Sequence, residues 1–147
     1  MNDRAVQRGT ALWDSGLYCA ESVLLAVAES LGIHSDIIPR IATGFCGGVS
    51  DTGGICGAVS GAIMAIGLAA GRSAPEQSAE EAYALTRRLL EAFAEEFGST
   101  SCRELTGCDL RTEEGRRAFE ENRVALRCRG YVEGATRLAV QLISERP

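Results

Sequence analysis

The sequence predicts an all-α protein, a single domain built as a bundle of five or more helices around a glycine-rich central helix. Three observations support this prediction. Apolar residues recur at steps of three and four along several segments, which is the pattern of an amphipathic helix. No segment alternates apolar and polar residues over the length of a strand. The chain has 147 residues, the length of one domain with a sizeable core, so we treat residues 1–147 as one helical, cysteine-rich domain.

The N-terminal part of the chain contains two predicted helices and a short third one. The first spans about residues 3–13 and ends before Ser15 and Gly16. The second spans about residues 17–31, with apolar residues at helical spacing and a glycine directly after it as a stop signal. A short helix is expected around residues 36–43.

The centre of the chain is almost free of charge. Residues 41–71 carry one charged side chain, Asp51, whereas the residues before them carry 8 and the residues after them carry 26. A segment this long with one charge is expected to lie mostly in the interior. It divides into a glycine-rich loop, residues 44–57, and a helix from Cys56 to about Leu68.

A long helix is expected after a polar linker at residues 72–77. Ser78 and Glu81 have the spacing of a capping box, and Gly98 marks the end of the helix. Apolar residues at steps of three and four predict one buried face, formed by Tyr83, Thr86, Leu90, Phe93 and Phe97. The remaining chain is predicted as a helical turn at residues 102–106, a charged helix at 112–123 and a last helix at 131–144.

Composition excludes several classes of protein. The net charge is −5, a poor match for a nucleic-acid surface, so no nucleic-acid partner is expected. All 15 basic residues are arginines, which excludes a Walker phosphate loop and a Schiff-base lysine. His34 is the single histidine, so one chain holds no multi-histidine zinc or haem site.

The chain is expected to be cytoplasmic and not associated with a membrane. Its first eight residues are polar and lack the apolar region of a secretory signal. The longest uncharged apolar stretch, Ile55–Gly71, is 17 residues, whereas a membrane-spanning helix needs about 20 strongly apolar residues. In a reducing cytoplasm, static disulfides are rare and thiols stay free.

Six cysteines stand out as candidate functional residues. Cys19, Cys56 and Cys102 each lie at the predicted start of a helix, where the helix dipole lowers the pKa of a thiol and favours the reactive thiolate. The alternative is that the cysteines are buried and act as small apolar side chains.

The spacing of the cysteines leaves their chemistry open. No two of them form a C-x-x-C pair, the pattern of thioredoxin-like sites and zinc ribbons. A site must therefore be assembled from distant segments. Three or four thiolates would suit zinc or an iron–sulfur cluster, and a pair would suit electron transfer by disulfide exchange.

The glycine-rich loop is a second candidate. Six of its 14 residues are glycines that would let the backbone approach a cofactor, cluster or thiolate, namely Gly44, Gly47, Gly48, Gly53, Gly54 and Gly57. The alternative is a tight crossing of the loop under neighbouring helices. An enzyme that binds an anionic small molecule here would have only Ser50, Asp51 and Thr52 as local polar groups. The Gly57-x-x-x-Gly61 spacing favours close packing against another helix of the chain, with a homodimer seam as the second possibility.

Several of these segments together resemble a family of redox-active proteins named for a C…GCAxxG…C…C cysteine pattern. The resemblance rests on Tyr18–Leu24, Ile41–Phe45, Cys56–Met64, Gly98–Ser99, Cys102–Leu110 and Cys128. At the central motif the order here is Cys56-Gly57-Ala58, and Cys46 lies where the pattern has only glycine-rich loop, so no family role is carried over to it. The resemblance implies a small helical protein with thiol redox or metal-linked activity.

Two hypotheses follow for the function. The favoured one is a cytoplasmic redox protein with an unidentified redox partner, whose cysteines gather around the glycine loop as redox thiols or ligands, namely Cys19, Cys56, Cys102, Cys108 and Cys128. Zinc or an iron–sulfur cluster, if present, would be held by Cys56, Cys102, Cys108 and Cys128. The alternative is a non-catalytic module that self-associates through its glycine-rich helix and contains structural cysteines.

Overall fold

The computed structural model describes residues 2–147 and is helical, as predicted. Within that range it contains no β-strand, only an isolated antiparallel bridge between Ile55 and Ser101. The elements in chain order are α1 (Asn2–Asp14), α2 (Cys19–Ser30), the 3₁₀ helix η1 (Arg40–Phe45), α3 (Cys46–Val49), α4 (Gly57–Ala70), α5 (Glu80–Phe97), α6 (Cys102–Thr106), α7 (Glu113–Glu121) and α8 (Val124–Ser144).

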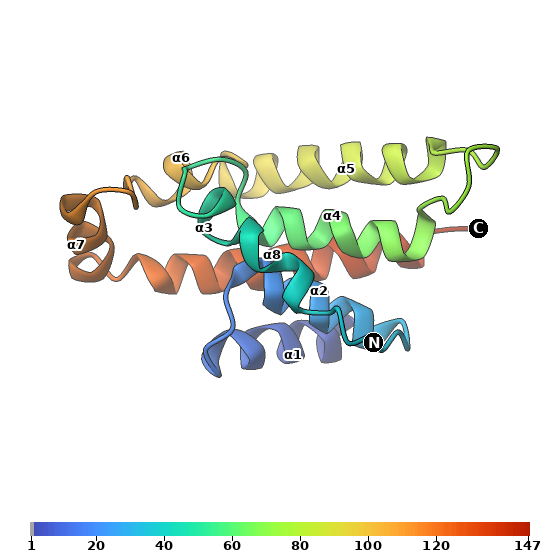
Figure 1. Ribbon diagram of the computed structural model, residues 1–147, viewed down its shortest axis with the longest axis horizontal. Coiled ribbons are helices and arrows are strands. Elements are labelled where there is room, and N and C mark those ends of the chain that lie inside the picture. Colours follow the sequence, from blue (N-terminus) through green and yellow to red (C-terminus); the bar gives the residue numbers. More distant parts are fainter. Residues whose placement is uncertain (1) are drawn as a thin grey trace.

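The long helices form the body of the molecule (Figure 1). Helix α4 packs against α2, α5 and α8, and α1 packs against α2 and α8. The short helices α3, α6 and α7 lie together at one end of this bundle, away from the two termini (Figure 1). The bundle therefore has one regular end and one end built from short elements and loops.

The central helix α4 packs tightly because its inner face is made of small residues. A methyl group added at Gly61 would lie 2.6 Å from the carbonyl oxygen of Ala20 in α2, so only glycine allows this close crossing. Gly61 and Gly57 are both buried. The small-residue face of α4 is thus used for packing within the chain, the preferred interpretation of its glycine spacing.

The long helix α5 differs in detail from its prediction. Its buried face is formed by Leu85, Leu89 and Phe93, whereas Tyr83 is 60% exposed. The predicted capping box is absent, because the helix begins at Glu80 with Ala79 as its N-cap. The Ser78 hydroxyl accepts a hydrogen bond from the Glu80 amide instead (3.1 Å).

Two further boundaries differ from the sequence-based expectation. The last helix begins at Val124, not near residue 131, because Arg123 adopts a left-handed conformation (φ 50°) that ends α7 and starts α8. The helix expected at residues 36–43 is the 3₁₀ helix η1, which begins at Arg40. Among residues 2–147, no helix combines the length and the apolar character needed to cross a membrane.

Candidate functional site

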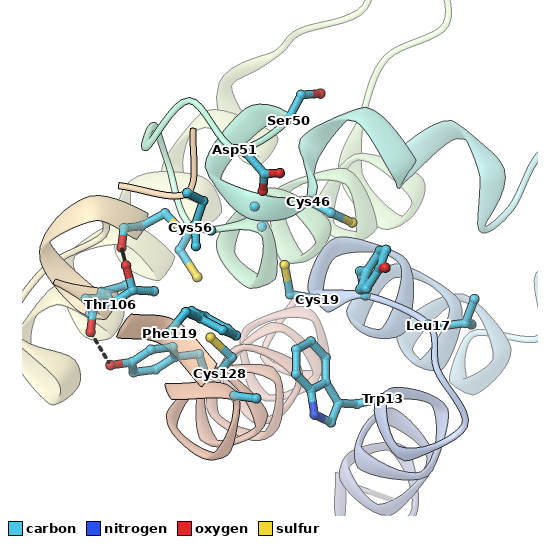
Figure 2. Close-up of a pocket in the computed structure, with 18 of the residues that line it drawn as sticks. Trp13, Leu17, Cys19, Cys46, Ser50, Asp51, Cys56, Thr106, Phe119 and Cys128 are labelled. Carbon is cyan, nitrogen blue, oxygen red and sulfur yellow. Dashed lines mark hydrogen bonds between the residues drawn. The ribbon is translucent and has the colours of Figure 1, made fainter. Parts of the chain in front are cut away.

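A cavity of about 670 Å³, partly open to solvent, lies at the end of the bundle that carries the short helices. Segments that are far apart in the sequence form its wall: the chain around Trp13–Cys19, the glycine-rich loop, and residues of α6, α7 and α8 (Figure 2). Five of the six cysteines line it, namely Cys19, Cys46, Cys56, Cys102 and Cys128. Tertiary folding thus gathers four of the five predicted redox cysteines and adds Cys46.

Cys19 and Cys46 meet over the first residue of α4. A methyl group added at Gly57 would lie 2.3 Å from Cys19 Sγ and 3.2 Å from Cys46 Cα. The Cys46 thiol donates to the Ala42 carbonyl (3.7 Å), and the neighbouring Cys19 side chain together with burial raises the pKa of Cys46 far above its usual range. Cys19 is half-buried and Cys46 is buried, so Cys19 is the more accessible of the two.

Cys56 and Cys102 are brought together by the bridge between Ile55 and Ser101. The Cys56 amide donates to the Thr100 carbonyl (2.7 Å), and the Cys102 amide donates to the Gly54 carbonyl (2.8 Å). This pattern makes Cys56 and Cys102 diagonal neighbours across the bridge. Their side chains therefore share the face opposite to that of Ile55, which is exposed.

Cys128 and Cys108 complete this second group of thiols. Cys128 comes from α8 and lies on the cavity wall near Phe119 (Figure 2). Burial raises the pKa of Cys128 to about 11; Cys102 and Cys108 add to the rise, and Arg127 opposes it. Cys108 is buried behind α6, where its thiol donates to the Thr106 carbonyl (3.4 Å), and it does not line the cavity.

The expectation of lowered thiol pKa values at helix starts is wrong for Cys56 and Cys102. Burial raises the pKa of Cys56 to about 12, although the amides of Val59 and Ala58 in the first turn of α4 act in the opposite direction. Burial and the nearby Asp51 carboxylate raise the pKa of Cys102. Desolvation of the thiolate outweighs the helix terminus here, so both side chains are thiols at neutral pH.

The glycine-rich loop contains an unusual left-handed turn. The five consecutive residues from Gly47 to Asp51 have φ values of 72°, 66°, 63°, 52° and 64°. The last three are not glycine, and a left-handed conformation costs such residues roughly 1–2 kcal/mol each. The Ser50 hydroxyl holds the turn by donating to the Gly44 carbonyl (2.9 Å). The turn connects Cys46, at its start, to Asp51, which lies at the cavity (Figure 2).

The six glycines proposed to approach a cofactor occupy different surroundings. Gly47 and Gly57 line the cavity. Gly48 lies against Cys102, since an added methyl group would be 2.4 Å from Cys102 Cβ. The others do not line the cavity: Gly53 lies against Arg103, Gly54 lies against Gly48, and Gly44 has open space around it. Most of the loop glycines therefore allow the loop to pass close to neighbouring segments of the chain.

Cys46 is the one cysteine of the cavity to which the sequence analysis gave no functional role. It lies outside the family pattern, yet it lies beside Cys19 at Gly57 and lines the same cavity. Its one local signal is the pair of glycines that follows it, which lets the chain turn sharply. Trp13 is half-buried on the cavity wall.

Within residues 2–147, no group of three or more His, Cys, Asp or Glu side chains is arranged to hold a metal ion. The zinc or iron–sulfur site expected from Cys56, Cys102, Cys108 and Cys128 thus has no support in the side-chain geometry and stays a prediction. The arrangement of the thiols fits chemistry between pairs of cysteines better.

Comparison with known proteins gives two matches. The model of a family described as "Putative redox-active protein (C_GCAxxG_C_C)" matches residues 17–142, a range that includes all six cysteines. A protein of Archaeoglobus fulgidus, described as "Uncharacterized protein", is 32% identical over 129 residues, which cover 81% of this chain and 85% of the relative. No solved structure matches the chain.

Proposed function

The chain belongs to the redox-active family whose model matches residues 17–142, and on that premise we propose that it carries out thiol–disulfide exchange in the cysteine-lined cavity. The observation that carries the proposal is the convergence of five cysteines from distant segments on one cavity, with Cys19 and Cys46 side by side at Gly57. All six cysteines are free thiols. We place the reaction in the cytoplasm, where thiols are kept reduced.

The proposed reaction begins at Cys19, which is more exposed than Cys46. Cys19 loses its proton to water, and its thiolate attacks one sulfur of a substrate disulfide, forms a mixed disulfide and releases the first substrate thiolate, which takes up a proton from water. Cys46 then attacks the Cys19 sulfur, and its proton passes to the second leaving sulfur. Two protein thiols and one substrate disulfide thus yield a protein disulfide and two substrate thiols. The raised pKa keeps Cys46 protonated in the resting protein, so Cys46 becomes a nucleophile only as it gives up its proton to the leaving sulfur in this second step.

Cys56, Cys102 and Cys128 form a second group of thiols on the wall of the same cavity, with Cys108 behind them. We propose that this group takes part in redox chemistry after the Cys19–Cys46 pair, because Cys56 and Cys102 are buried whereas Cys19, where the reaction begins, is half-buried. A disulfide formed first by Cys56, Cys102 or Cys128 would reverse this order.

The test is to map disulfides after reaction with bis(2-hydroxyethyl) disulfide. Free thiols are blocked by alkylation, counted by intact mass and located by peptide mapping. We expect the loss of two thiols and a Cys19–Cys46 linkage, which Cys19→Ser and Cys46→Ser each abolish. Cys108→Ser is the matched control, because Cys108 does not line the cavity and the linkage should still form. Six alkylated thiols after oxidation would overturn the proposal.

A second measurement separates this chemistry from a metal site. Iron, sulfide and zinc are determined on protein purified without oxygen, for the wild type and Cys56→Ser. We expect less than a tenth of an equivalent of each. A full equivalent of zinc or iron that is lost in Cys56→Ser would show that the thiols are ligands and would replace the exchange mechanism.

A further inference from the structure

We propose that the cavity selects a small, uncharged disulfide with flat apolar groups and disfavours anionic disulfides. This inference rests on the proposed function and adds its substrate class. Three features of the cavity carry it: its size, the aromatic side chains in its wall, and an unpaired carboxylate beside the thiols.

The size and the wall of the cavity fit a small aromatic molecule. A volume of about 670 Å³ lies within the range of small-molecule sites, about 300–1,000 Å³. Four of the eight aromatic residues of the chain line it, and each comes from a different segment: Trp13, Tyr18, Phe119 and Tyr131. Such a wall recognises flat apolar groups through ring contacts.

Two of these rings are available to a ligand. Tyr131 is fixed, because its hydroxyl donates to the Leu105 carbonyl (3.2 Å) and its ring meets Phe97 edge to face (5.2 Å between centroids). Trp13 and Phe119, in contrast, take part in no aromatic pair among residues 2–147. Both face the cavity together with Cys19 and Cys128 (Figure 2). A ring bound between them would bring an attached disulfide to these sulfurs.

The charges around the cavity disfavour an anion next to the thiols. In the described part of the chain, the Asp51 side chain has no hydrogen bond and no ion pair, whereas Asp14 is paired with Arg129. The negative charge of Asp51 raises the pKa of Cys102, so this carboxylate is close enough to the thiols to repel an anion bound beside them. Arg116 is the one cationic residue lining the described cavity; its guanidinium donates to the Leu110 carbonyl (2.9 Å), and Glu120 lines the same wall.

Ligand binding can be measured without any redox step. The chain has a single tryptophan, Trp13, so its fluorescence reports on the cavity alone. The probes are 4-nitrobenzyl alcohol and 4-nitrobenzoate, which share a ring and differ in charge. We expect saturable quenching by the alcohol and at least tenfold weaker binding of the benzoate. Phe119→Ala should weaken binding of the alcohol, and the control Tyr83→Ala, an exposed ring outside the cavity, should not.

The role of Asp51 is tested with two reactive disulfides, uncharged 4,4′-dithiodipyridine and anionic 5,5′-dithiobis(2-nitrobenzoate). Rates are divided by those of a free small-molecule thiol to remove intrinsic reactivity. We expect a preference of at least tenfold for the uncharged reagent and a several-fold smaller preference in Asp51→Asn. The matched control is Asp14→Asn, which removes an acidic side chain that is paired with Arg129 and does not line the cavity.

The two proposals fail in different ways. Equal quenching by 4-nitrobenzyl alcohol and 4-nitrobenzoate, or an equal normalised rate with both disulfides, would overturn the substrate class. Selective binding of the alcohol together with no disulfide after oxidation would instead overturn the proposed exchange reaction, because neither nitroaromatic probe reacts with thiols.

Discussion

The regular end of the bundle and the cysteine-lined end are built on different principles. In the bundle, α2, α4, α5 and α8 bury apolar side chains completely, among them Val27, Val59, Leu89 and Phe93. At the cysteine-lined end, short helices and loops enclose a cavity, and partly exposed side chains form its wall. Regular helices hold the molecule together and supply Cys19 and Cys128, and short helices and loops bring Cys46, Cys56 and Cys102 to them.

Backbone strain and unsatisfied polar groups are also distributed unequally. The four non-glycine residues with positive φ among residues 2–147 are Val49, Ser50, Asp51 and Arg123, all at the cysteine-lined end. Strain of this kind persists only where the surrounding structure holds it in place, and it is often found at functional sites. In the bundle, one buried side-chain oxygen of the described residues lacks a hydrogen bond, Thr136 Oγ1.

The largest expected effect comes from opening the bundle core. Phe93 is fully buried, and Phe93→Ala should lower the free energy of unfolding by about 3–5 kcal/mol. Phe119→Ala, at the cavity, should lower it by about 1 kcal/mol, since that ring is already half-exposed. Urea unfolding followed by circular dichroism measures both. Equal losses would contradict the division between the two ends.

The contact between the two ends is tested at Gly57. In Gly57→Ala the new methyl group overlaps Cys19 Sγ, which should cost about 1–3 kcal/mol of stability and abolish the Cys19–Cys46 disulfide. The control is Gly67→Ala on the same helix, where no atom lies within 4 Å of the added group. That change should raise stability by about 0.5–1 kcal/mol through helix propensity. Unchanged disulfide formation in Gly57→Ala would contradict the geometry.

The buried thiols predict a loss of stability at high pH. The pKa of Cys56 is raised to about 12 in the folded chain, whereas an unfolded cysteine has a pKa of about 8.5. Between these values unfolding releases a proton, so stability falls as pH rises, by up to about 1.4 kcal/mol per pH unit per thiol. Urea unfolding of the reduced protein from pH 7 to 10.5 measures this slope. In Cys56→Ala unfolding should release one proton fewer, so the free energy of unfolding should fall less steeply with pH. The same slope as in the wild type would contradict the raised pKa of Cys56.

Two buried threonines give the smallest and most direct comparison. At the cysteine-lined end, the Thr106 hydroxyl donates to the Cys102 carbonyl (2.7 Å) and accepts from the Cys108 amide (3.2 Å). Thr106→Val should therefore cost about 1–2 kcal/mol. Thr136→Val in the bundle removes an unpaired hydroxyl and should raise stability by about 1 kcal/mol. Thermal unfolding measures the change in stability of both variants. A change of the same sign in both would contradict the difference between the two hydroxyls.

Much of the fold could be predicted from the sequence, because helices depend on neighbours a few residues apart. The periodicity located the cores of the long helices, and the glycine spacing predicted the close packing of α4. The helix start at Cys102 was also predicted correctly, and Cys19, expected in the first turn of a helix from about residue 17, is the first residue of α2. The left-handed turn from Gly47 to Asp51 was not predicted, because it includes Val49, and a β-branched residue rarely adopts positive φ.

The sequence by itself determined that this protein is helical, has a nearly uncharged centre and is rich in free cysteines, since these properties follow from composition and local order. Only the tertiary structure decided which thiols meet. Cys46 lies beside Cys19 because the chain passes close to Gly57. Cys56 lies beside Cys102 because a β-bridge pairs the distant residues Ile55 and Ser101. The tertiary structure also decided the protonation of Cys56 and Cys102. A helix start lowers the pKa of a thiol, but burial, which depends on the whole fold, raises the pKa of these two above its usual value.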